Sequence, residues 1–84
     1  MKIEMYTRAS CQFCFAAKRL LALQGLDYEE VSLDREPQKL QEMLQRTGNR
    51  AVPQVIIDGE PIGGFRELSG LQSSGRLKEL TSAH

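Results

Sequence analysis

The 84-residue sequence is poor in the residue types that several functions need. It has no tryptophan, its only histidine is the last residue, His84, and it has just two cysteines, Cys11 and Cys14. A structural zinc ion takes four ligands, so these three side chains do not suffice for one. Eleven basic residues balance eleven acidic ones. A chain without net charge has no field that would attract nucleic acid or an acidic membrane.

The sequence also has no segment typical of a membrane or secreted protein. No apolar run is long enough to cross a bilayer, and the first residues alternate like a strand rather than forming the apolar core of a signal peptide. We therefore expect a cytoplasmic protein, in which a Cys-x-x-Cys pair is typical of redox chemistry or metal binding. With 40% hydrophobic residues, a chain of this length builds one small core. We expect a single domain over residues 1–84 that works as a monomer.

Hydrophobic periodicity predicts the regular elements of the chain. Alternating or β-branched apolar residues predict strands, over 2–6, 27–33, 54–57 and 60–62. Apolar residues at three- and four-residue spacing predict helices, over 11–24, 37–48 and 65–73, with a last turn over 76–80. The resulting order is β-α-β-α-β-β-α, an α/β fold with a four-stranded mixed sheet flanked by helices.

Turn and cap residues mark the ends of these elements. Gly25 and Gly48 stand where two predicted helices end, and Asp58-Gly59 is a strong signal for a two-residue hairpin. The strand after this hairpin contains Pro61, which cannot donate to a ladder, so we expect it at a sheet edge. Ser10 is the predicted N-cap of the first helix. Pro37 is predicted to occupy the first position of the second helix.

The stretch Ser10-Cys11-Gln12-Phe13-Cys14 begins the first helix, where backbone N–H groups lack helical partners. These donors and the positive end of the helix dipole favour the thiolate of Cys11, and Arg8 three residues upstream adds positive charge. Cys14 follows one turn later on the packed face, within reach for a disulfide, and we expect it to be less exposed. Phe13 is placed on the same apolar face, although it also lies beside the sulfur.

Three motifs together give a family resemblance over nearly the whole chain. They are Tyr6-Thr7-Arg8 followed by Cys11-Gln12-Phe13-Cys14, Thr47-Gly48 before Val52-Pro53, and Ile62-Gly63-Gly64-Phe65. In these motifs the sequence resembles the glutaredoxins of the thioredoxin-fold superfamily. The resemblance implies a thioredoxin fold in which Pro53 is cis and lies close to the active-site turn. It also implies a glutathione-dependent thiol–disulfide oxidoreductase, with Cys11 as nucleophile and Cys14 as resolving thiol.

The implied partners are glutathione, as cosubstrate, and glutathionylated or disulfide-containing proteins. The residues expected to bind glutathione lie in three segments near the cysteines: Arg8, Phe13, Val52, Pro53, Gly64, Phe65, Arg66 and Glu67. The backbone at Val52 is expected to pair with the tripeptide as a short added strand. The N-terminus of the third helix is expected to bind the γ-glutamyl carboxylate of glutathione. Glu67 is expected to bind the γ-glutamyl amino group, and Arg8 the glycyl carboxylate.

Other interpretations remain open for this sequence. Glutaredoxins without proline at the second motif position can hold a 2Fe–2S cluster between two protomers, and here that position is Gln12, so Cys11 is a possible cluster ligand. A redoxin that takes electrons from thioredoxin reductase and passes them to a reductase is a second alternative. Two buried structural thiols are a further interpretation of the cysteines, which their position at a helix start disfavours. Arg66 and Glu67 are also compatible with a solvated pair on a first helical turn.

Overall fold

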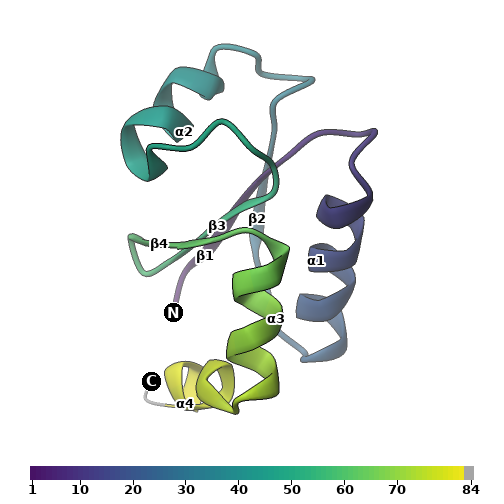
Figure 1. Cartoon of the computed structure of the whole chain (residues 1–84), viewed down its shortest axis with the longest axis vertical. Coiled ribbons are helices and arrows are strands. Elements are labelled where there is room, and N and C mark those ends of the chain that lie inside the picture. Colours follow the sequence, from purple (N-terminus) through teal and green to yellow (C-terminus); the bar gives the residue numbers. More distant parts are fainter. Residues whose placement is uncertain (83–84) are drawn as a thin grey trace.

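The computed structural model describes residues 1–82, so His84 lies outside the described residues. Four strands form one mixed sheet in the order β2-β1-β3-β4 (Figure 1). Their bounds are β1 Ile3–Thr7, β2 Glu29–Ser32, β3 Gln54–Ile57 and β4 Glu60–Gly63. β1 pairs in parallel with β2 and antiparallel with β3, and β4 lies at an edge. The predicted α/β class, the mixed sheet and the edge position of Pro61 are confirmed.

Four helices cover the two faces of this sheet: α1 Gln12–Leu23, α2 Lys39–Thr47, α3 Phe65–Ser73 and α4 Arg76–Ser82. α1 and α3 run side by side, and α2 lies apart from them (Figure 1). Because side chains of a strand alternate between the two faces of a sheet, β1 contributes residues to two hydrophobic clusters. Ile3 and Met5 join the core with α1, α3 and α4, whereas Tyr6 packs with Met43 of α2.

The turn residues behave as their chemistry predicts. Gly25 and Gly48 adopt left-handed φ values of 71° and 70° at the ends of α1 and α2. Asp58 and Gly59, with φ values of 51° and 83°, form the tight connection from β3 to β4. A two-residue hairpin with both central φ values positive matches the right-handed twist of its strands.

Two predicted helix starts are wrong. The N-cap of α1 is Cys11 rather than Ser10, because the Cys11 sulfur accepts the N–H of Cys14 at 3.1 Å and so takes the capping role. α2 begins at Lys39, so Pro37 lies before the helix. The N–H of Lys39 bonds the carbonyl of Glu36, three residues back, which makes a tighter turn than an α-helix.

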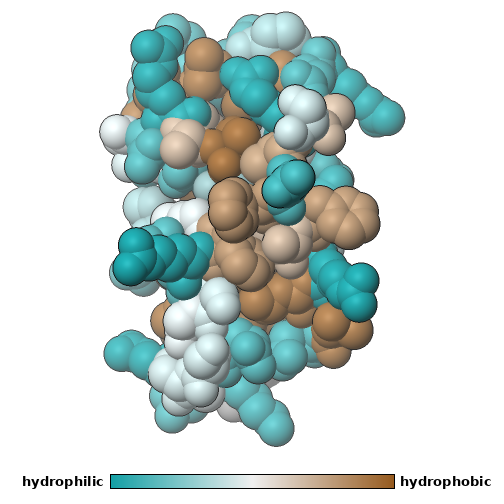
Figure 2. Space-filling view, turned by 45° about the vertical axis from the view of Figure 1, so that its right-hand side comes forward, coloured by the Kyte–Doolittle hydropathy of each residue, from teal (hydrophilic) through white to brown (hydrophobic). Residues whose placement is uncertain are grey.

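The prediction that Phe13 packs on the buried face of α1 is also wrong. Phe13 is 63% exposed, because Cys14, Ala17 and Leu21 form the stripe that meets the sheet. Figure 2 shows that apolar side chains gather on the molecular face over α1 and α3. At the other end of the chain, α4 continues to Ser82, beyond the single turn predicted over 76–80.

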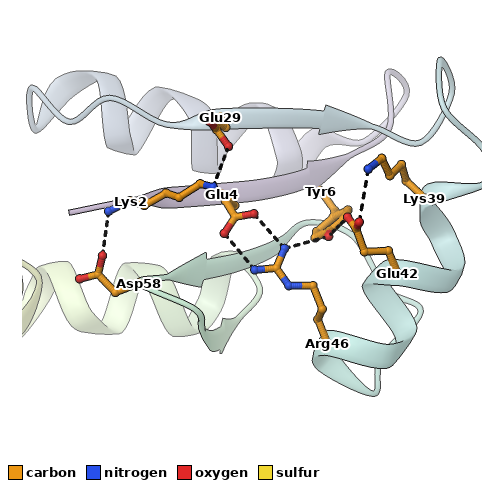
Figure 3. Close-up of polar contacts among 8 residues, drawn as sticks. All are labelled: Lys2, Glu4, Tyr6, Glu29, Lys39, Glu42, Arg46 and Asp58. Carbon is orange, nitrogen blue, oxygen red and sulfur yellow. Dashed lines mark hydrogen bonds and ion pairs between the residues drawn. The ribbon is translucent and has the colours of Figure 1, made fainter.

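A polar network fastens α2 to β1 (Figure 3). Arg46 donates two hydrogen bonds to the carboxylate of Glu4, at 2.8 and 2.9 Å, and a third to the hydroxyl oxygen of Tyr6 at 3.0 Å. Tyr6 in turn donates to Glu42. Bidentate pairing of this kind fixes both distance and orientation. It therefore sets where α2, and the loop that follows it, lie on the sheet.

We expect Arg46→Met to lower the free energy of unfolding by about 2 kcal/mol at neutral pH, because the carboxylate of Glu4 loses its charged donors. The hydrogen bonds of Arg46 hold the pKa of Glu4 below its ordinary value of 4.5. A depressed carboxyl pKa stabilises the fold above that value, and the contribution is lost as pH falls below it. The difference between variant and parent in urea unfolding should therefore shrink below pH 4.5.

Arg50→Met, at an exposed position in the loop after α2, is the matched control for this prediction. It removes the same charge and is expected to change the free energy of unfolding by less than about 0.5 kcal/mol. Equal losses in the two variants would contradict a specific role for the network.

Candidate active site

Cys11 lies at the N-terminus of α1 with its sulfur in a polar setting. Its backbone is extended, with φ −107° and ψ 111°, and its Sγ accepts the N–H of Cys14. The same sulfur lies 3.6 Å from the carbonyl oxygen of Val52, to which the thiol donates. Cys11 is partly exposed. A sulfur that is accessible and faces helix N–H groups is placed to act as a thiolate nucleophile.

Cys14 is the opposite kind of thiol. It is a free cysteine that is only 1% exposed on the packed face of α1, as predicted. Burial, and then the hydrogen bond with Cys11, raise the pKa of Cys14 to about 12. Cys14 therefore stays protonated at neutral pH. The two thiols lie only one helical turn apart, yet Cys11 is partly exposed and Cys14 is buried.

The Val52-Pro53 peptide bond is cis, which confirms the expectation from the resemblance. It brings the Val52 carbonyl to Cys11, and Pro53 is buried beneath it. Gly64 packs against the same loop, since a Cβ atom there would lie 3.3 Å from the Pro53 carbonyl oxygen. Segments 41 residues apart in the sequence thus meet at one sulfur.

The first turn of α3 adjoins this loop and is shaped by glycine. Gly63 has φ +121°, and a Cβ atom would approach Cγ of Glu67 to 2.8 Å, so only glycine fits. Glu67 accepts the N–H of Gly64 at 2.7 Å through Oε1 and so caps the helix. The Arg66-Glu67 pair is therefore not simply solvated, because one of its carboxylate oxygens is used in the fold.

A groove of about 490 Å³ lies between the starts of α1 and α3. Its walls are mostly apolar and aromatic, with a charged pair at one side: Phe13, Gly64, Phe65, Arg66, Glu67 and Ser69. The rings of Phe13 and Phe65 stack with centroids 6.0 Å apart. This groove explains why Phe13 is exposed.

Arg8 lies in the loop before α1 and forms an ion pair with Asp34 at 3.6 Å. The other oxygen of Asp34 accepts the N–H of Ala9 at 2.6 Å, so Asp34 holds this loop in place. The pair is about half exposed, and an exposed pair contributes at most about 1 kcal/mol. An incoming carboxylate can therefore replace Asp34 at little cost. Periodicity gave no signal for Asp34, which lies two residues after the end of β2.

Within residues 1–82, no three His, Cys, Asp or Glu side chains gather to hold a metal ion. The helices described there are also too short or too polar to span a membrane.

Comparison with known proteins agrees with this geometry. The sequence model of the family described as Glutaredoxin matches residues 3–62. Glutaredoxin 3 of Escherichia coli is 38% identical over 78 residues, which cover 93% of this chain and 94% of that protein. Glutaredoxin of Pseudomonas aeruginosa is 36% identical over 81 residues, covering 96% of each chain. The crystal structure of a buckwheat glutaredoxin–glutathione complex aligns with a TM-score of 0.88 and 28% identity, over 96% of this chain and 76% of that one.

The family match includes both cysteines and the cis-proline loop, and the structural match extends over the sheet and its helices. The sheet order, the parallel first crossover and the helix that Cys11 caps are those expected of the thioredoxin fold. The chain belongs to the glutaredoxin family and is a thiol–disulfide oxidoreductase with a thioredoxin fold.

Proposed function

We propose that this glutaredoxin uses glutathione to reduce protein–glutathione mixed disulfides and protein disulfides. The observation that carries the proposal is the partly exposed sulfur of Cys11, which contacts the Val52 carbonyl of the cis-proline loop. Phe13, two residues further along α1, lines the groove between α1 and α3. The buckwheat protein, which aligns over 96% of this chain, was solved as a glutathione complex. We further propose that the chain acts as one domain over residues 1–84, as a monomer in the cytoplasm.

Glutathione is an anionic tripeptide, and the residues around Cys11 offer complementary groups. The backbone of Val52 would pair with the peptide backbone of glutathione as an added strand. The N-terminus of α3 would receive the γ-glutamyl carboxylate. Arg8 would release Asp34 and pair with the glycyl carboxylate of glutathione. Glu67 would pair with the γ-glutamyl amino group. The stacked rings of Phe13 and Phe65 supply the apolar wall.

The proposed cycle begins with Cys11. Its thiolate attacks the sulfur of glutathione in the mixed disulfide, and the protein thiolate leaves and takes a proton. A second glutathione then attacks the glutathionylated Cys11 and releases oxidised glutathione. With a protein disulfide, Cys11 instead forms a mixed disulfide with the substrate protein. Cys14 then attacks the sulfur of Cys11, which closes the Cys11–Cys14 disulfide and releases the substrate thiolate. A stabilised Cys11 thiolate is also a good leaving group, which suits the reduction of both glutathione mixed disulfides and protein disulfides.

The proposal is tested with a small glutathione mixed disulfide, glutathione, glutathione reductase and NADPH. We expect NADPH consumption that depends on the enzyme and rises with glutathione concentration until it saturates. A parallel assay replaces glutathione and its reductase with thioredoxin reductase. Turnover in the second assay alone would overturn the glutathione dependence and favour a redoxin that draws electrons from thioredoxin reductase.

A further inference from the structure

A charged network lies next to Cys14 that the proposed cycle does not use. Lys18 stands one turn after Cys14 on α1, a spacing that puts side chains about 5–6 Å apart at Cβ. Its Nζ donates to Oε2 of Glu30 at 2.9 Å. The buried hydroxyl of Thr7 donates to that same oxygen at 2.6 Å.

This network holds Lys18 in place as a cation. Two donors on one oxygen fix the carboxylate of Glu30, which in turn restrains the lysine across the β1–β2 crossover. The hydrogen bond to Glu30 raises the pKa of Lys18, and the bond from Thr7 lowers the pKa of Glu30. Both groups therefore remain charged at neutral pH. Lys18 supplies positive charge and cannot accept a proton.

We propose that Lys18 is a positioning residue for the resolving step, in which its ammonium stabilises the thiolate that Cys14 must form. This inference rests on the proposed function, because only the reduction of a protein disulfide requires Cys14. The Thr7–Glu30–Lys18 network then acts in the reduction of protein disulfides and not in the reduction of glutathione mixed disulfides.

The resolving step balances without a further reactant. The Cys14 thiol gives up its proton to solvent, and its sulfur forms a bond with Sγ of Cys11. The bond between Cys11 and the substrate sulfur breaks, and the leaving thiolate takes a proton from solvent. The enzyme is oxidised to its internal disulfide, and the substrate cysteine is reduced to a thiol.

The groups around Cys14 explain why Lys18 matters at this step in particular. In the reduced enzyme, burial and then Cys11, through its hydrogen bond and charge, oppose ionisation of Cys14, whereas the backbone amide of Arg8 and the ammonium of Lys18 favour it. In the mixed disulfide, Cys11 carries neither a proton nor a charge. The opposition of Cys11 is then gone, while burial still opposes ionisation and the two favourable groups act against it. Glu30 on β2 is the neighbouring anion, and Lys18 neutralises it.

The first test compares two activities of Lys18→Met. We expect protein-disulfide reduction to slow about five- to tenfold, as for loss of one nearby charge, while reduction of a small glutathione mixed disulfide stays within about twofold. Lys18→Arg should restore the rate because it keeps the charge. Arg19→Met removes the neighbouring exposed cation of α1 and should change neither activity. Equal losses in both activities would mean a structural role and overturn the inference.

The second test measures ionisation directly. In Cys11→Ala, Cys14 is the only cysteine left, so the Cβ NMR chemical shift of ¹³C-labelled cysteine follows this one thiol without interference from the two tyrosines. We expect Lys18→Met to raise the titration midpoint by about half to one pH unit relative to Cys11→Ala alone, and an unchanged midpoint would overturn the inference. This titration does not require turnover. If the parent chain fails the glutathione assay, the proposed function fails, whereas the coupling of Lys18 to Cys14 is still decided.

Discussion

Replacing Cys11 with serine is expected to abolish both reactions, by about 10³-fold or more, because it removes the nucleophile that starts each branch. Cys14→Ser is expected to keep the reduction of glutathione mixed disulfides and to lose the reduction of protein disulfides. The two activities are measured side by side, each coupled to NADPH through glutathione and glutathione reductase. The expected pattern follows from the partly exposed position of Cys11 and the buried position of Cys14.

The fold of Cys11→Ser should be intact, which makes the loss interpretable. Serine is among the best N-cap residues, and its hydroxyl oxygen can accept the N–H of Cys14 that the sulfur accepts now. Urea unfolding should therefore differ from the parent by less than about 0.5 kcal/mol. If Cys11→Ser kept the reduction of mixed disulfides while Cys14→Ser lost it, the assigned roles would be reversed.

Leu68→Ala is expected to cause a large loss of stability. Leu68 is fully buried where α3 meets the sheet and α1. Deleting its side chain removes buried surface and leaves a cavity, which costs about 3 kcal/mol. A domain of this size is stable by roughly 5–10 kcal/mol, so the loss is a large fraction of the total. Thermal unfolding should shift down by about 12–24 °C.

Leu23→Ala provides the matched comparison, since it makes the same deletion on α1 at a side chain that is 72% exposed. We expect a change within about 0.5 kcal/mol, because no cavity forms and alanine favours the helix. Circular dichroism during heating and urea titration reports both variants. Similar losses at the two positions would show that burial at Leu68 does not govern the stability of α3.

Local chemistry was enough to predict most of the secondary structure. Gly25 and Gly48 end helices because they accept positive φ, and Asp58-Gly59 makes the hairpin for the same reason. The apolar run of β3 is buried on both faces, as its composition predicts. The position of Cys11 at a helix start also followed from local pattern. These features depend on preferences within a few residues.

Periodicity was less successful where two neighbours compete for a helix face. Phe13 and Cys14 both lie near the apolar stripe of α1, and the sequence does not say which one meets the sheet. The sheet takes Cys14, so Phe13 is free to stack on Phe65 of α3. The rotation of a helix about its axis by one residue is set by packing, which hydrophobic spacing does not resolve.

The sequence by itself determined the order of the elements, the ends that glycine marks, the family and the two thiols in the first turn of α1. Only the tertiary structure decided which charges meet: Arg8 with Asp34, Arg46 with Glu4, and Lys18 with Glu30. Backbone preferences are local and can be read along the chain. Contacts between distant side chains depend on strand order and register, here with β1 between β2 and β3, and only the folded sheet fixes these.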